Sequence, residues 1–303
     1  MREIKKKNPR RVLLQVPEGL VTVAGEIADR VGCEVIISLD PCYGACDLRD
    51  SEAKRLGCDL LVHLGHSPFG IKEEVPTIYI PWKLEGDVKG ILEKEHHKIK
   101  DYRKIGLVTT VNFLHMLEEV RSLLEEKGHE VLISKGSRTR PGQVLGCDLG
   151  AALNTDPDAY FFFGSGRFHP LGIAMKTEKP VFSLDVEMGT LEKVDPEGMF
   201  RERYAAIGRA GNAEVFGILI STKPGQVNYE LARGLKEFLE SKGKKVYIFS
   251  MDRITPEKLL GLKVDCFVNT ACPRIAVENR KEFEKPVLNP DEVMELFSSI
   301  EKI

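Results

Sequence analysis

The sequence predicts an α/β protein of three similar domains, each with a parallel four-stranded sheet flanked by helices. Strand-like apolar runs alternate with helical stretches along the chain, which is typical of parallel sheets. The phrases GCEVIIS, GHEVLIS and GKKVYIFS each follow a helical stretch that closes on a glycine. Because each third of the 303 residues repeats this order, we interpret the chain as a triplicated unit of about 100 residues.

The repeat sets the order of the expected elements. Each third contributes four strands and one long helix. The strands are expected at 11–16, 34–39, 59–65, 77–82, 104–110, 130–134, 159–164, 180–185, 214–221, 245–250, 265–270 and 286–289. The helices are expected at 19–32, 113–128 and 229–243, with a short further one before the strand at 77–82. We place the domains at 1–100, 101–205 and 206–303, in a pseudo-threefold arrangement around a central site.

Composition excludes several classes of protein. With 42% hydrophobic and 30% charged residues, the chain is typical of a globular domain. The net charge of −2 argues against direct binding of nucleic acid, and we interpret the basic opening as a solvated tail. No apolar run approaches the length of a membrane span, and the opening lacks the apolar core of a signal peptide. We therefore expect a cytoplasmic protein.

Three of the seven cysteines carry the functional argument. Cys46, Cys147 and Cys272 each follow a strand-like run, and each lies in a different third. Ligands of parallel sheets bind beyond the carboxyl ends of the strands, so all three lie on the expected functional edge. If the thirds surround one axis, their thiolates can meet on an iron–sulfur cluster and leave one iron without a protein ligand.

The sequence positions of the other four cysteines favour roles other than binding the cluster. Cys33, Cys58 and Cys266 lie next to strand starts, where a free cysteine packs as a small apolar residue. Cys42 and Cys46 almost begin the three-cysteine loop of standard radical S-adenosylmethionine enzymes, but Arg49 occupies the third position. A zinc site is disfavoured because no second close pair accompanies them, and the HxxH spacing of His63 and His66 is a weak signal.

Polar loops after other strands offer candidate binding residues. The glycines of 164–166 suggest a dinucleotide loop, but His169 replaces the final glycine of that fingerprint. The loop either wraps a smaller adenosine-containing ligand or forms a tight turn. Arg274 either holds a carboxylate or makes a surface ion pair. Asp185 and Glu187 are not assigned as an acid–base pair.

Six motifs in order resemble a known family: QVPEGL, PCYGACD, VHLGHSP, VLGCD, FGSGRFHP and NTACPR. Together they resemble the archaeal diphthamide-biosynthesis enzymes, the 2-(3-amino-3-carboxypropyl)histidine synthases, from about Val12 to Val287. The resemblance implies a [4Fe–4S] cluster with one cysteine ligand from each domain, at Cys46, Cys147 and Cys272. Eukaryotic relatives have threonine in place of Cys42, which agrees with a non-ligand role for that residue.

The resemblance also implies a reaction. S-adenosylmethionine binds the open iron, and its 3-amino-3-carboxypropyl group is transferred as a radical to C2 of a histidine of translation elongation factor 2, releasing methylthioadenosine. No side chain is assigned a catalytic role apart from the cluster. Further implied partners are a second copy in a homodimer and an unidentified electron donor. Residues expected to line the S-adenosylmethionine pocket are Glu18, His169, Asp185, Gln226 and Arg274.

Two alternatives stay open. Quinolinate synthase, a [4Fe–4S] dehydratase, has a similar arrangement of three α/β units and three cysteines, but the YGACD and ACPR loops favour the transferase. A non-catalytic iron–sulfur protein is the other alternative. Electron carriers usually close the coordination of their cluster with four ligands, so tight binding of S-adenosylmethionine would distinguish the two.

Overall fold

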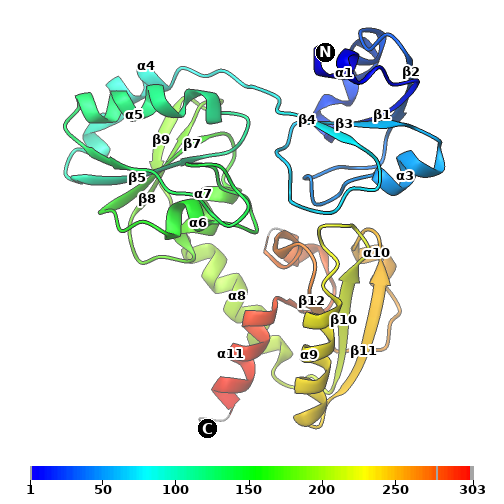
Figure 1. Ribbon diagram of the computed structural model, residues 1–303. Helices are drawn as coiled ribbons and strands as arrows, with labels where there is room; N and C mark the ends of the chain where they lie inside the picture. Colours follow the sequence, from blue (N-terminus) through cyan, green and yellow to red (C-terminus); the bar gives the residue numbers. More distant parts are fainter. Residues whose placement is uncertain (1, 278, 301–303) are drawn as a thin grey trace. The chain divides into compact units, whose positions relative to one another are not determined.

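The computed structural model describes residues 2–277 and 279–300 (Figure 1). The chain divides into two compact units. The first comprises Met1–Gly166 and Lys179–Lys193, and the second comprises Arg167–Glu178 and Val194–Ile303. Two of the three sheets belong to the first unit and one to the second.

The first sheet has four parallel strands in the order β2-β1-β3-β4, as predicted. Its elements are α1 (Arg2–Lys7), β1 (Arg11–Gln15), η1 (Glu18–Val23), α2 (Ala24–Asp29), β2 (Glu34–Ser38), α3 (Asp50–Arg55), β3 (Leu60–Leu64) and β4 (Thr77–Ile80). Leu14 packs with α1 and α2 on one face, whereas Leu13 packs with α3 on the other. Apolar residues therefore fill both faces, which explains the continuous apolar run of β1.

Three local expectations for this sheet are wrong. The helix expected at 19–32 divides into η1 and α2, and no helix lies between β3 and β4, where all residues are described. The basic opening is not simply a tail, because it forms α1. Ile4 of α1 is buried in the core of the first sheet, while its lysines are exposed.

The middle sheet has five strands in the order β6-β5-β7-β8-β9. Its elements are α4 (Val88–Glu95), η2 (His96–Lys98), β5 (Lys104–Thr109), η3 (Leu114–Met116), α5 (Leu117–Glu126), β6 (Glu130–Leu132), α6 (Gly150–Leu153), β7 (Ala159–Gly164), β8 (Val181–Asp185) and β9 (Thr190–Lys193). The four predicted strands, β6, β5, β7 and β8, are parallel, and β9 is an unpredicted fifth strand that pairs antiparallel with β8. A tight turn joins them, and only Leu191 of β9 is buried, so the short edge strand lacks a clear sequence signal.

The third sheet has four parallel strands in the order β11-β10-β12-β13, as predicted. The second unit contains α7 (Phe168–Ala174), α8 (Glu197–Ala210), β10 (Val215–Ser221), α9 (Tyr229–Ser241), β11 (Lys245–Met251), α10 (Pro256–Leu259), β12 (Cys266–Asn269), η4 (Pro273–Ala276), η5 (Arg280–Glu282), β13 (Val287–Leu288) and α11 (Pro290–Ile300). Helix α9 lies along β10 and β11, and α11 packs against α8 (Figure 1). The helix α8 runs through residue 205, the domain boundary expected from the sequence.

The strands β2 and β6 lead into long loops at their carboxyl ends, whereas a short loop joins β12 to η4. Cys46 follows β2, Cys147 follows β6 and Cys272 follows β12, as expected. No helix among the described residues is long and apolar enough to cross a membrane.

Candidate functional site

The cysteines differ in exposure, and Cys33, which we expected to pack as an apolar residue, is half-buried. Cys147 is exposed, and Cys46 and Cys272 are half-buried. Cys58 and Cys266 are buried, and burial raises the pKa of both thiols. A thiol with a raised pKa is a poor metal ligand, because the thiolate is the form that binds.

The Cys46 loop is fixed by the side chain of Gln15, which is fully buried at the end of β1. Its Nε2 donates to the carbonyl oxygen of Asp47 at 2.6 Å, and its Oε1 accepts from the backbone N–H of Arg49 at 3.2 Å. One amide group thus holds the loop on both sides of Leu48. The backbone carbonyl of Asp47 and the backbone N–H of Arg49 are thus satisfied without a regular strand or helix.

Arg49, the residue that interrupts the standard three-cysteine loop, has a structural role here. Its Nη1 lies 3.4 Å from Oδ2 of Asp40, and its Nε lies 3.6 Å from Oδ1 of Asp47. Asp40 and Asp47 stand on either side of Cys46 in the chain, so the guanidinium braces the loop across the cysteine. We conclude that Arg49 replaces a possible third sulfur ligand with an ion-pair brace.

The Cys147 loop is anchored by the neighbouring carboxylate of Asp148. Asp148 accepts from the backbone N–H of Arg138 at 2.8 Å, from the Ser137 hydroxyl at 3.0 Å and from the N–H of Gly150 at 3.0 Å. Burial by itself raises the pKa of Asp148, but these donors together outweigh it and lower the pKa below its ordinary value. The carboxylate also leaves no room for a side chain at Gly136, whose added Cβ would lie 2.1 Å from Oδ1.

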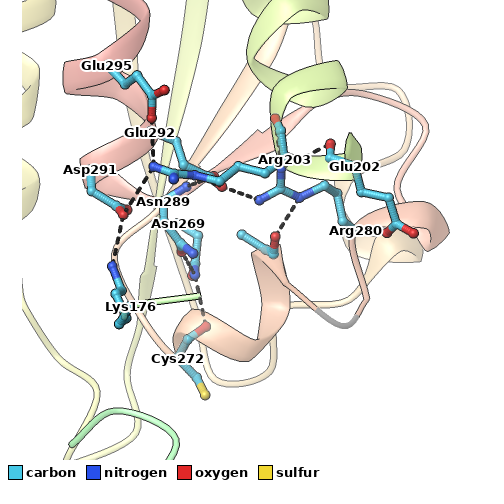
Figure 2. Close-up of polar contacts among 11 residues, drawn as sticks. Lys176, Glu202, Arg203, Asn269, Cys272, Arg280, Asn289, Asp291, Glu292 and Glu295 are labelled. Atoms are coloured by element: carbon cyan, nitrogen blue, oxygen red, sulfur yellow. Dashed lines mark hydrogen bonds and ion pairs between the residues drawn. The ribbon is translucent and has the colours of Figure 1, made fainter. Parts of the chain in front are cut away.

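The Cys272 loop is anchored by a buried polar network (Figure 2). Asn269, at the end of β12, donates through Nδ2 to the carbonyl oxygen of Cys272 and to Oδ1 of Asn289, each at 2.9 Å. The N–H of Asn289 in turn donates to Oε2 of Glu292 at 2.8 Å. In Figure 2 the sulfur of Cys272 points away from this network. The loop is therefore held through its backbone.

The same network contains an ion pair. Arg280 donates to Oε1 of Glu292 at 2.5 Å, and their side chains are only 5% and 4% exposed. Arg280 also donates through Nε to the carbonyl oxygen of Ala276 at 2.5 Å, which ties down the last turn of η4 after Cys272. Arg203 of α8 approaches Glu292 at 3.4 Å and Glu295 at 2.8 Å, so α8 and α11 are joined to the loop.

All three loops thus combine an accessible thiol with a fixed backbone. This donor set suits an iron–sulfur cluster, which is held by cysteine thiolates. Cys46 and Cys147 belong to the first unit and Cys272 to the second, and the meeting of their sulfur atoms stays a prediction. Cys42, expected not to bind the cluster, is buried.

The structure brings together two of the five residues expected around S-adenosylmethionine. Both His169, in α7, and Arg274, in η4, belong to the second unit. The guanidinium of Arg274 lies over the ring of Phe168, 4.3 Å from its centroid. Burial, and then the charge of Arg274, lowers the pKa of His169 to about 4. His169 is consequently neutral near pH 7, and the positive charge at this place is that of Arg274.

The other three residues have more local contacts. Glu18 is exposed and accepts from the Tyr43 hydroxyl at 3.4 Å. Asp185 accepts from the N–H groups of Gly166, Glu187 and Met188, so capping of turns accounts for its carboxylate. Gln226 is half-buried and donates through its backbone N–H to the carbonyl oxygen of Lys223. Their part in a ligand pocket stays a prediction.

Sequence reasoning missed one constellation. Ligand atoms of Cys42, His63 and His66 all lie within 4.8 Å of one another. Burial, and then the neighbouring His66, lowers the pKa of His63 to about 3, and burial lowers the pKa of His66 to about 4. The HxxH spacing was a signal for the two histidines. The contribution of Cys42 depends on how its loop folds back onto β3, which spacing does not reveal.

The fold and its loops define a class: an α/β protein of three sheets, each presenting one accessible cysteine at the carboxyl edge of its strands. Residues 16–302 match the family model described as "Putative diphthamide synthesis protein". The chain belongs to this diphthamide synthesis family. It is 38% identical to the 2-(3-amino-3-carboxypropyl)histidine synthase of Pyrococcus horikoshii, over 97% of this chain and 87% of the relative.

More distant and structural relatives agree. The chain is 33% identical to subunit 1 of the 2-(3-amino-3-carboxypropyl)histidine synthase of Caenorhabditis elegans, over 96% of this chain and 76% of the relative. The crystal structure of Dph2 from P. horikoshii with a 4Fe–4S cluster has a TM-score of 0.93 at 38% identity, over 98% of this chain and 88% of that one. The predicted family, the predicted fold class and the expectation of a transferase are confirmed.

Proposed function

We propose that the chain transfers the 3-amino-3-carboxypropyl group of S-adenosylmethionine to C2 of a histidine of translation elongation factor 2, the first step of diphthamide biosynthesis. The observation that carries the proposal is the set of three anchored loops that each contain one of these cysteines, in a chain of this family. The P. horikoshii relative with a 4Fe–4S cluster supports the cofactor. Family membership also favours this reaction over that of a quinolinate synthase-like dehydratase or a non-catalytic iron–sulfur protein.

The cluster ligands in this proposal are Cys46, Cys147 and Cys272. When bound, such a cluster supplies one electron and one iron that lacks a protein ligand. The protein itself holds the backbone of each loop, through Gln15 for the first loop, Asp148 for the second and Asn269 for the third. A fixed loop pays little entropy on binding, so this preorganisation favours a cluster with one thiolate from each loop.

In the reaction that we propose, the bond between the sulfonium sulfur and the aminocarboxypropyl carbon accepts one electron and breaks. Methylthioadenosine leaves, the carbon radical adds to C2 of the imidazole, and return of the electron to its source with loss of the C2 proton restores the aromatic ring. Which carbon–sulfur bond breaks depends on how the substrate is held. Arg274 is suited to the substrate carboxylate, because a guanidinium binds carboxylates bidentately. Neutral His169 beside it adds no second positive charge that would repel the sulfonium.

The remaining residues and partners are part of the same proposal. Glu18, Asp185 and Gln226 are proposed to line the pocket with His169 and Arg274. The chain is proposed to act as a cytoplasmic homodimer of three-domain subunits and to receive electrons from a separate donor. Because the acceptor is one histidine of a folded protein, the pocket must also open toward the surface of elongation factor 2.

The reaction can be tested with anaerobically reconstituted protein, dithionite, S-adenosylmethionine and elongation factor 2. We expect methylthioadenosine, together with elongation factor 2 that is heavier by one aminocarboxypropyl group. Predominant 5′-deoxyadenosine would overturn the proposed bond cleavage. Turnover of iminoaspartate with dihydroxyacetone phosphate would instead identify a quinolinate synthase.

The ligands can be tested by iron analysis of alanine variants. Cys46→Ala, Cys147→Ala and Cys272→Ala are each expected to lose most of the iron and the visible absorbance of the cluster. Cys58→Ala is the matched control, because Cys58 is a buried thiol between α3 and β3, outside all three loops. A full complement of iron in any of the first three would remove that residue from the ligand set.

A further inference from the structure

We propose that Cys42, His63 and His66 bind one divalent metal ion of the zinc class, at a site separate from the three cluster cysteines. All three residues belong to the first sheet and its loops. Their ligand atoms lie within 4.8 Å of one another, and Cys42 and His63 are 2% and 0% exposed. One thiolate and two imidazoles form a donor set that zinc prefers among the common divalent ions.

The hydrogen bonds around Gln15 leave one nitrogen of His63 available to a metal. Oε1 of Gln15 accepts from the N–H of Arg49, and its Nε2 donates to the carbonyl oxygen of Asp47, so both backbone partners fix the orientation of the amide. Oε1 lies 2.9 Å from Nδ1 of His63. Because a carbonyl oxygen only accepts, Nδ1 must carry the proton. Nε2 of His63 therefore has its lone pair directed away from Gln15.

This arrangement is typical of a metal-bound histidine. Metal ligands of this type usually donate their second ring N–H to a carboxylate or carbonyl oxygen, which fixes the tautomer and the direction of the ring. Tyr79 of β4 packs beside the same ring, with the centroids 5.6 Å apart. The imidazole of His63 is thus held in the orientation that ligation requires before any metal binds.

The second imidazole already faces the first. Nε2 of His63 and Nδ1 of His66 are 3.0 Å apart and share one hydrogen bond. Two nitrogens that bind one zinc ion at about 2.1 Å in tetrahedral geometry are separated by roughly 3.4 Å. The metal would replace the shared proton with a movement of about 0.4 Å. His66 is half-buried, which provides a path for the ion from solvent.

The thiol of Cys42 completes the set. A zinc-bound sulfur lies roughly 3.5 Å from each nitrogen, so the cluster of ligand atoms must contract by about 1 Å. Rotation about the Cα–Cβ bond of cysteine moves the sulfur by more than this. Three protein ligands leave a fourth position for water or a small anion, as in zinc sites that are not purely structural.

The metal site and the cluster site share Gln15 but no ligand. Cys42 stands four residues before Cys46, and Gln15 holds both His63 and the Cys46 loop. Binding of a metal at the first site is expected to stiffen the second. The two sites are nevertheless distinguishable, because one takes iron and sulfide and the other takes a single ion.

The test is a titration with Co²⁺ under anaerobic conditions, in protein that carries Cys46→Ala, Cys147→Ala and Cys272→Ala and therefore cannot form the cluster. We expect one equivalent of Co²⁺ to bind with a thiolate-to-cobalt charge-transfer band and the visible bands of four-coordinate cobalt. Adding Cys42→Ser is expected to abolish the charge-transfer band. Adding His66→Gln is expected to weaken binding at least tenfold, and Cys33→Ser, the matched control, to leave binding unchanged.

Absence of the band in the triple variant, or its persistence with Cys42→Ser, would overturn the site. Circular dichroism of each variant shows whether it is folded. A second test compares wild-type protein and Cys42→Ser after both are reconstituted with zinc and iron. The variant is expected to lose zinc and to keep iron. Loss of iron with retention of zinc would contradict the assignment of Cys42 while leaving the transferase proposal to its own test.

Discussion

Glu292→Gln provides a sharp test of how the Cys272 loop is held. The substitution keeps the shape of the side chain and removes its charge, while Arg280, with a side chain 5% exposed, stays in place. Breaking a buried ion pair by removing one partner costs about 3–5 kcal/mol, because the other charge stays buried without compensation. The glutamine oxygen can still accept from Arg280, so we expect about 3 kcal/mol, the lower end of that range.

The free energy of unfolding of the cluster-free protein would be measured by chemical denaturation, and hydrogen exchange would locate the loss. Peptides that cover β12, the Cys272 loop and α11 are expected to exchange faster, whereas those of the first unit are expected to be unchanged. Glu240→Gln is the matched control, because Glu240 pairs with Lys236 at 3.7 Å on the exposed face of α9. Exposed pairs contribute only about 0–1 kcal/mol. Equal losses in the two variants would refute the structural role of the buried pair.

Two further predictions follow from the loops. Gly136→Ala places a methyl group against the Asp148 carboxylate. We expect faster alkylation of Cys147 and an unchanged rate at Cys33. An unchanged alkylation rate at Cys147 would contradict the anchoring role of Asp148. Lowering the pH from about 6.5 toward 4 is expected to destabilise the second unit, because the pKa of His169 is about 4 when folded and about 6.5 when unfolded. The unfolded chain then binds the proton more readily than the folded chain. The free energy of unfolding therefore falls by at most about 1.4 kcal/mol per pH unit. A His169→Gln variant with the same pH dependence of unfolding would contradict this.

The sequence predicts the strands of this protein well, because parallel strands with both faces buried are continuous apolar runs. The run FFFG of β7 and the run LVHL of β3 are clear on that ground. It also predicts the position of each important cysteine, since a loop after a strand end is a local property. The antiparallel β9 escapes prediction because Leu191 is its one buried residue and the strand has only four residues.

The anchors of the loops escape prediction for a different reason. Gln15 and Asp47 are 32 positions apart, and Asn269 and Asn289 are 20 apart, so nothing in either local pattern indicates that they meet. Polar residues at strand ends look like candidate ligands, and Asp185 shows that such a residue can instead cap turns. For Arg49 the sequence shows only a mismatch to a known cysteine motif, whereas the structure shows ion pairs with Asp40 and Asp47.

The division of the chain into units has a consequence for its synthesis. The segment of α7 belongs to the second unit although it separates β7 from β8, two neighbouring strands of the middle sheet. The middle sheet therefore cannot be completed until residue 193 has left the ribosome, well after its first strand. No single cut yields either unit whole, and a fragment that ends at residue 166 would expose the long edge of β7 to other chains.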